Sequence, residues 1–227
     1  SALKSDKFNI KIAIARDAAF SFYYADDLDA FASAGAELVP FDALHDPYLP
    51  KVDGLFIGGG FPETQMAKLS ANESMRSNIK AAINNGMPTY AECGGLMYLA
   101  QSISWHKNNY PMVGIIPGNI QVHKRPQGRG YVKLETTDSM PWSFNGADNT
   151  NKIAAHEFHY ASLNDLPKGQ QFAYDVKRGM GINGTEDGIV IKNSLSSFSH
   201  QRNTASNPWV KQFVDYVRKI AANRAKT

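Results

Sequence analysis

The first hundred residues alternate between short apolar runs and amphipathic helical patterns, and this alternation constrains the fold most. Runs that predict buried strands lie at residues 8–16, 36–41, 53–57 and 88–91. Helical patterns lie at residues 23–34 and 73–84, and another helix is predicted over residues 95–103. Strand alternating with helix predicts an α/β fold with a mostly parallel central sheet flanked by helices.

The pattern changes after residue 111, where helical spacing gives way to strands and loops. Further strands are predicted at residues 112–122, 130–136, 153–162, 171–176 and 188–191, and a closing helix at residues 207–225. These segments indicate an antiparallel portion or an extension of the sheet. Because no internal repeat or low-complexity linker interrupts the chain, we expect a single domain over residues 1–227.

Composition excludes several classes of protein. The 227 residues carry a net charge of +3, with basic residues scattered rather than gathered into a stripe, so nucleic acid is not an expected partner. The single cysteine excludes an intramolecular disulfide and fits a reducing compartment. No apolar run reaches the length of a membrane span, and the N-terminal residues lack the apolar core of a secretory signal. We therefore expect a cytoplasmic protein without a membrane partner.

The most informative segment contains that cysteine, at residues 88–97 (PTYAECGGLM). A predicted strand leads into Cys93, two glycines follow, and a helical pattern begins at once, which is the layout of a nucleophile elbow. Glycines suit the strained turn, and the following helix N-terminus stabilises a thiolate. The Gly94 amide would face a developing oxyanion. A buried structural cysteine is the alternative interpretation.

Three glycines end the third predicted strand, at residues 58–60. A glycine run there lets the backbone approach a ligand closely and offers N–H donors, although an ordinary tight turn has the same composition. A phosphate loop is not indicated, because no Gly-Lys-Ser/Thr sequence follows.

A thiol nucleophile needs a base, and the chain has six histidines. His200 ends an apolar and serine-rich run just before the last helix, where a structural histidine would also fit. His156 and His159 flank Glu157, and strand alternation places Glu157 and His159 on one face. Without a further ligand this set does not predict a metal site. Glu92 precedes the cysteine, but neighbouring strand residues point to opposite faces, so it is not assigned to the site.

Four segments resemble a known family. They are residues 16–24 (RDAAFSFYY), 58–63 (GGGFPE), 91–99 (AECGGLMYL) and 156–160 (HEFHY). Together they resemble the C-terminal glutaminase domain of cobyrinic acid a,c-diamide synthase, a class I-type glutamine amidotransferase of the cobyric acid synthase branch. The resemblance runs in matching order from about residue 11 to residue 217 and implies the flavodoxin-like fold of class I amidotransferases.

The resemblance also implies roles for individual residues. Cys93 corresponds to the nucleophile and His200 to the catalytic histidine, with Gly94 and either Gly59 or Gly60 as oxyanion-hole donors. Glu63 is a candidate pocket residue, and His156, Glu157 and His159 are expected to have a structural or pocket-lining role, ranked below that of His200. Many class I glutaminases place a carboxylate two residues after the histidine, where this chain has Arg202. Because the resembled branch also lacks that carboxylate, no third member of the catalytic group is named.

The implied activity is release of ammonia from glutamine, with no cofactor in this domain. In the resembled synthases an N-terminal domain uses ATP and Mg²⁺ to activate a tetrapyrrole carboxylate, and this sequence contains no P-loop for such a role. The expected partners are therefore glutamine, an ATP-dependent synthetase domain or subunit, and a tetrapyrrole acceptor. The resemblance implies cobyrinic acid or hydrogenobyrinic acid as the acceptor, and related members of the branch amidate other tetrapyrroles such as sirohaem or nickel sirohydrochlorin. The alternatives are a catalytically silent binding module and a cysteine hydrolase acting on another amide.

Overall fold

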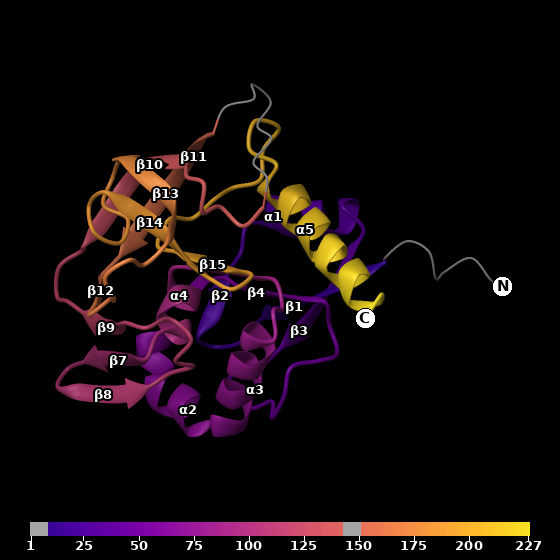
Figure 1. The fold of residues 1–227 in the computed structure, drawn as a ribbon. Helices are drawn as coiled ribbons and strands as arrows, with labels where there is room; N and C mark the ends of the chain where they lie inside the picture. The colour runs from indigo at the N-terminus through magenta and orange to yellow at the C-terminus, as the bar shows by residue number, and fades with distance from the viewer. Residues whose placement is uncertain (1–8, 143–150) are drawn as a thin grey trace.

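The structure, a computed structural model, describes residues 9–142 and 151–227 (Figure 1). Five parallel strands form one side of its main sheet: β3 (Ala36–Phe41), β1 (Ile10–Ala15), β4 (Gly54–Ile57), β6 (Thr89–Glu92) and β15 (Ser194–Ser197). They lie side by side in that order. The predicted α/β fold with a parallel core is confirmed.

Four antiparallel strands extend this sheet beyond β15. In spatial order they are β14 (Glu186–Ile191), β13 (Phe172–Arg178), β10 (Gly128–Thr136) and β11 (Lys152–His159). The complete sheet therefore has nine strands, and the extension stands apart from the helices in Figure 1. The antiparallel portion predicted from the second half of the chain is present.

Helices cover both faces of the parallel strands. One face packs against α1 (Ala25–Ser33) and α5 (Trp209–Arg224), which lie side by side in Figure 1. The other packs against α2 (Met66–Ala71), α3 (Glu73–Asn84) and α4 (Gly94–Leu99). Strand alternation divides the side chains between them: Ile12 and Ile14 of β1 face α1 and α5, whereas Ala13 faces α2 to α4.

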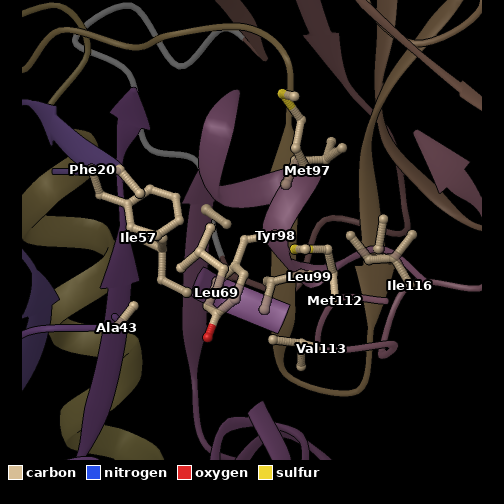
Figure 2. Close-up of a cluster of buried hydrophobic side chains, with 14 of the residues drawn as sticks. Phe20, Ala43, Ile57, Leu69, Met97, Tyr98, Leu99, Met112, Val113 and Ile116 are labelled. Atoms are coloured by element: carbon tan, nitrogen blue, oxygen red, sulfur yellow. The ribbon is translucent and has the colours of Figure 1, made fainter. Parts of the chain in front are cut away.

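Helix α3 shows how local sequence produces this packing. The Asn72 side chain caps its N-terminus by accepting from the Met75 N–H at 3.3 Å. Met75, Ile79 and Ile83 recur every four residues and are fully buried. Each such side chain stabilises the fold by about 1.5–3 kcal/mol. Figure 2 shows the neighbouring part of this core, where Tyr98 and Leu99 of α4 lie among Leu69, Met112 and other apolar side chains.

Two smaller sheets complete the structure. One has four strands in the order β12 (Ala161–Asn164), β9 (Asn119–Val122), β7 (Ser102–Trp105) and β8 (Asn108–Pro111). The other pairs β2 (Phe20–Phe22) with β5 (Gly59–Gly60), and a 3-10 helix, η1 (Pro62–Gln65), follows β5. This short ribbon matters for the site because it holds the glycine run.

Several element boundaries differ from the sequence prediction. The helix predicted over residues 95–103 ends at Leu99, and Ile103 belongs to β7. The strand predicted over residues 112–122 is confined to β9, and the one over residues 153–162 divides into β11 and β12. Helix α2 and strands β2, β5 and β15 were not predicted. Tertiary pairing rather than local periodicity defines these short elements.

Candidate active site

Cys93 occupies a strained turn between β6 and α4. Its φ of 47° and ψ of −99° form a conformation that residues other than glycine rarely adopt. The Cys93 N–H donates to the Ser197 carbonyl at 2.7 Å, and the Gly95 N–H donates to the Gly58 carbonyl at 3.1 Å. A Cβ on Gly95 would lie 2.2 Å from the Ile57 carbonyl oxygen, so only glycine fits there. This is the strand-turn-helix geometry expected of a nucleophile elbow.

His200 lies just beyond β15, at the same end of the sheet as the elbow. Two backbone hydrogen bonds join it to His156 at 2.7 and 3.0 Å, so the base predicted from sequence is tied to the antiparallel extension. Burial alone lowers the pKa of His200. The neighbouring Cys93 sulfur and Glu92 carboxylate outweigh burial and hold that pKa well above its ordinary value. A protonated imidazole beside a thiol is the arrangement that stabilises a thiolate.

Glu92 is the functional candidate that sequence reasoning missed. Its Oε2 lies 3.6 Å from His200 Nδ1, and its side chain is 4% exposed. The other oxygen, Oε1, accepts from the Tyr90 hydroxyl at 2.7 Å and from the Gln201 N–H at 2.9 Å. The carboxylate is therefore fixed in place while it faces the imidazole.

Strand alternation predicted that Glu92 and Cys93 point to opposite faces, and Glu92 was therefore left out of the site. That prediction failed because alternation applies only to residues within one strand. Glu92 shares the α1 and α5 face with Tyr90, as expected for residues two apart in β6. Cys93 has already left the strand, so its direction is set by the turn instead. His200 lies past the strand ends, where one ring is in contact with both neighbours. The sequence feature that could have identified Glu92 was a carboxylate directly before the cysteine in an otherwise uncharged run.

The glycine run lies opposite the elbow. The Gly60 amide nitrogen is 3.1 Å from the position that a Cβ on Gly94 would occupy, so these two predicted donor residues adjoin. A Cβ on Gly59 would lie 2.8 Å from His200 Cε1, and one on Gly60 would lie 1.9 Å from the Ala19 carbonyl oxygen. Close packing therefore explains both glycines, and Gly60 lines the cavity that opens onto the sulfur.

A brace from the N-terminal segment holds the glycine run. The Tyr23 hydroxyl donates to the Ala15 carbonyl and accepts from the Gly58 N–H at 3.1 Å. Burial raises the pKa of Tyr23, so the hydroxyl stays neutral and serves as donor and acceptor together. Asp17 accepts from the Phe20 N–H at 3.0 Å and directs the chain into β2, which pairs with β5. The residues 16–24 singled out from sequence therefore build the wall opposite the nucleophile.

A cavity of ≈ 330 Å³ opens onto Cys93 and His200. Its remaining walls are Ser21, Phe22, Tyr23, Tyr24, Gly60, Phe61, His156 and Phe158. A smaller hollow of ≈ 20 Å³ adjoins it and shares Cys93 and Gly60. Glu63, predicted to lie at the pocket, lines this hollow. The larger space falls in the size range of small-molecule sites, with mostly apolar walls and few polar groups.

The residues of the HEFHY segment divide between two roles. His156 lines the larger cavity, whereas Glu157 and His159 turn inward and contact each other at 3.0 Å. His159 Nδ1 also contacts the Ala161 carbonyl at 2.9 Å, so both of its ring nitrogens face acceptors. A Cβ on Gly128 would lie 2.2 Å from His159 Nε2, which leaves no room for a ligand on that side.

Glu157 is likewise fully bonded. Its oxygens accept from the Met180 N–H at 2.7 Å and the Gly181 N–H at 3.0 Å. Burial raises the pKa of Glu157, but the contact with His159 and these amides outweighs burial and lowers it overall. Glu157 is absent from the lining of both cavities, and His159 touches only the smaller one. The pair therefore supports the sheet extension.

Residues 9–142 and 151–227 bring together no cluster of three or more His, Cys, Asp or Glu side chains that could hold a metal ion. In the same ranges no helix has both the length and the apolar character needed to span a membrane.

Comparison with known proteins places the chain. The profile of the CobB/CobQ-like glutamine amidotransferase domain matches residues 11–208. Cobyrinate a,c-diamide synthase of Magnetococcus marinus is 42% identical over 200 residues, which cover 88% of this chain and 42% of that protein. The enzyme of the same name from Methanosarcina acetivorans is 40% identical over 228 residues, covering 95% and 45%. The chain thus spans less than half the length of these relatives.

Among solved structures, that of PurLQS from Thermotoga maritima superimposes with a TM-score of 0.67. The match covers 93% of this chain and 99% of that one at 14% sequence identity, so it concerns the fold alone.

Proposed function

The chain belongs to the CobB/CobQ-like glutamine amidotransferase family, and we propose from this premise that Cys93 is the nucleophile that releases ammonia from glutamine. One observation carries the proposal: the Cys93 sulfur, the His200 imidazole and the Glu92 carboxylate come together at the strained turn, beside the glycine run. Nucleophile, base and orienting carboxylate in this order form a complete group for acyl transfer.

In the first half-reaction the Cys93 thiolate attacks the side-chain amide carbon of glutamine. The oxyanion accepts hydrogen bonds from the amides of Gly94 and of Gly60 or Gly59. Protonated His200 gives its proton to the nitrogen, the C–N bond breaks, and ammonia leaves a glutamyl thioester. The raised pKa of His200 keeps the imidazolium available for this transfer.

In the second half-reaction water attacks the thioester carbon and His200 takes a proton from that water. The C–S bond breaks, glutamate leaves, and the thiolate and imidazolium form again. Glu92 orients the ring and stabilises its charged form throughout, because Glu92 itself is fixed by Tyr90 and Gln201.

We assign the ammonia to amidation of a tetrapyrrole carboxylate. The support is the name of the relatives, cobyrinate a,c-diamide synthase, together with the family match. ATP and Mg²⁺ would act on a synthetase domain or subunit that activates the carboxylate, and this chain would supply ammonia to it. The names of the relatives favour cobyrinic acid as the acceptor. An assay with that synthetase would compare cobyrinic acid with sirohaem and nickel sirohydrochlorin.

Covalent labelling of Cys93 tests the proposal directly. The electrophilic glutamine analogue 6-diazo-5-oxo-L-norleucine should add once to Cys93, as peptide mass spectrometry would show, and glutamine should protect the site. Cys93→Ala should abolish both the labelling and the conversion of glutamine to glutamate. A catalytically silent module would react no faster with this analogue than with an electrophile lacking the amino-acid part, and that result would refute the proposal.

A further inference from the structure

Glu63 lines the ≈ 20 Å³ hollow beside Cys93, and this half-buried acid has one buried carboxylate oxygen without a partner among the described residues. Its Oε2 atom is buried and accepts no hydrogen bond from any residue in the described ranges. The other two acids near the site differ, since Glu92 and Glu157 each accept hydrogen bonds from two or more donors. A buried oxygen without a donor costs free energy, so it marks a place where a ligand can supply one.

The structure fixes the position of Glu63 relative to the chemistry. It belongs to η1, which begins two residues after Gly60. Pro62 packs against the elbow, with its Cδ 3.1 Å from the position of a Cβ on Gly94. The glycine run, the sulfur and the carboxylate are therefore parts of one rigid wall.

The two cavities beside Cys93, both lined by residues within the described part of the chain, offer this carboxylate no lysine or arginine, and Lys68 lines a separate space that Glu63 also borders. Burial raises the pKa of Glu63, and no basic neighbour offsets that effect. A positively charged group arriving with a ligand would both donate the missing hydrogen bond and stabilise the ionised acid.

We propose that Glu63 binds the α-ammonium group of glutamine, an inference that rests on the function proposed for Cys93. The hollow holds about one water-sized group, which suits an ammonium but not a whole amino acid. Because the hollow and the larger cavity share Cys93, the amide can lie at the sulfur while the ammonium enters the hollow and the carboxylate end occupies the larger space. Glu63 thereby selects α-amino acid amides over simple amides.

The test compares glutamine with 4-carbamoylbutanoate, which is glutamine without its amino group. Wild type should prefer glutamine in kcat/KM by roughly 10- to 100-fold, the value of a charge-assisted hydrogen bond. Glu63→Gln should lower kcat/KM for glutamine by a similar factor, mainly through KM, and leave the analogue unaffected. The matched control is Glu37→Gln, an exposed acid on the edge strand β3.

Labelling separates failure of this inference from failure of the proposed function. Glu63→Gln should slow labelling of Cys93 by 6-diazo-5-oxo-L-norleucine 10- to 100-fold and leave alkylation by iodoacetamide unchanged. Equal loss with both reagents, or unchanged preference for glutamine over its deamino analogue, would overturn the role of Glu63 while the analogue still labels Cys93 in wild type. If the analogue does not label wild type at all, the function proposed for Cys93 has failed instead. Thermal unfolding of both variants confirms that each is folded.

Discussion

Two carboxylate–histidine pairs lie in different regions of this molecule and differ in what surrounds them. Glu92 and His200 meet at 3.6 Å where the parallel strands end, and the imidazole is in contact with the Cys93 sulfur and a cavity. Glu157 and His159 meet at 3.0 Å inside the antiparallel extension, with side chains only 2% exposed. Under the proposed function, the same pair of side-chain types serves reaction in one region and folding in the other.

The difference lies in the hydrogen bonds that each ring has left to make. Both nitrogens of His159 face protein acceptors, and its ring stacks on Phe198 with centroids 4.1 Å apart. His200 lies between the Glu92 carboxylate and the Cys93 sulfur, beside an open space. A histidine whose hydrogen bonds are all satisfied by the protein has no proton to exchange with a substrate.

The largest expected effect comes from removing the reactive ring. His200→Asn should lower kcat for glutamine hydrolysis by roughly 10⁴-fold or more, because loss of a catalytic base removes most of the rate enhancement. The melting temperature should change little. Steady-state glutaminase assays measure the change in kcat, and thermal unfolding measures the change in melting temperature. The control is His45→Asn, which replaces an exposed histidine ring that does not line the cavity. If His200→Asn lost much of its stability but kept its activity, Glu92 and His200 would be the structural pair and not the catalytic one.

The inward pair should respond in the opposite way. Glu157→Gln should destabilise the fold by about 3–5 kcal/mol, since it leaves His159 without its buried partner, while folded protein keeps its turnover. The pKa of Glu157 is lowered by folding, so its contribution is present above the unfolded-state value of 4.5 and is lost as pH falls through the lower folded-state value.

Denaturant unfolding of wild type and Glu157→Gln from pH 3 to pH 7 measures this contribution. The gap in unfolding free energy between the two proteins should narrow at the acid end. The variant Asp175→Asn, at an exposed acid on β13 of the same sheet extension, should show almost no gap at any pH. A gap that stayed constant down to pH 3 would contradict an ionised Glu157.

The smallest of the three effects concerns the orienting carboxylate. Glu92→Gln should reduce kcat by roughly 100-fold, within the range of a general acid–base contribution, because the 3.6 Å contact orients the ring without replacing it. It should also lower the pKa of His200, since one of the groups that raise this pKa is gone. Activity that needs the imidazolium would then fall at lower pH than in wild type.

The pH–rate profile of kcat tests whether the activity of Glu92→Gln falls at a lower pH than that of wild type. A purely structural role of Glu92 would not produce this shift. Glu92→Asp should recover part of the rate, because the charge is restored with a shorter side chain. A profile of Glu92→Gln that kept the wild-type midpoint would show that the carboxylate does not act on His200.

The local sequence predicted helices and strands well where the apolar residues follow a clear helical or strand spacing. Strand β3 and helix α3 have the predicted bounds, and the buried faces follow the predicted spacing. Strand β15 was missed because Ser194–Ser197 is mostly polar, yet it is buried and pairs in parallel with β6. Its hydroxyls are partly satisfied by backbone carbonyls, such as that of Ser199, which no periodicity reports.

The site was predictable in its parts that depend on local turn chemistry. The glycines around Cys93 and in the 58–60 run signalled close backbone approach before any fold was known. Glu92 required the direction of a side chain at the point where the strand ends, and the different uses of His156 and His159 required the tertiary neighbours of each. Long-range placement of this kind does not follow from spacing alone.

The unusual backbone of Cys93 has a consequence for judging other proteins of this shape. An L-residue held at φ 47° raises the free energy of the folded chain by about 1–3 kcal/mol, and glycine would relieve most of it. A chain with glycine in place of Cys93 would consequently melt at a higher temperature, express well and superimpose closely on the active one. Robust folding therefore says nothing about whether a protein built on this scaffold still turns over glutamine.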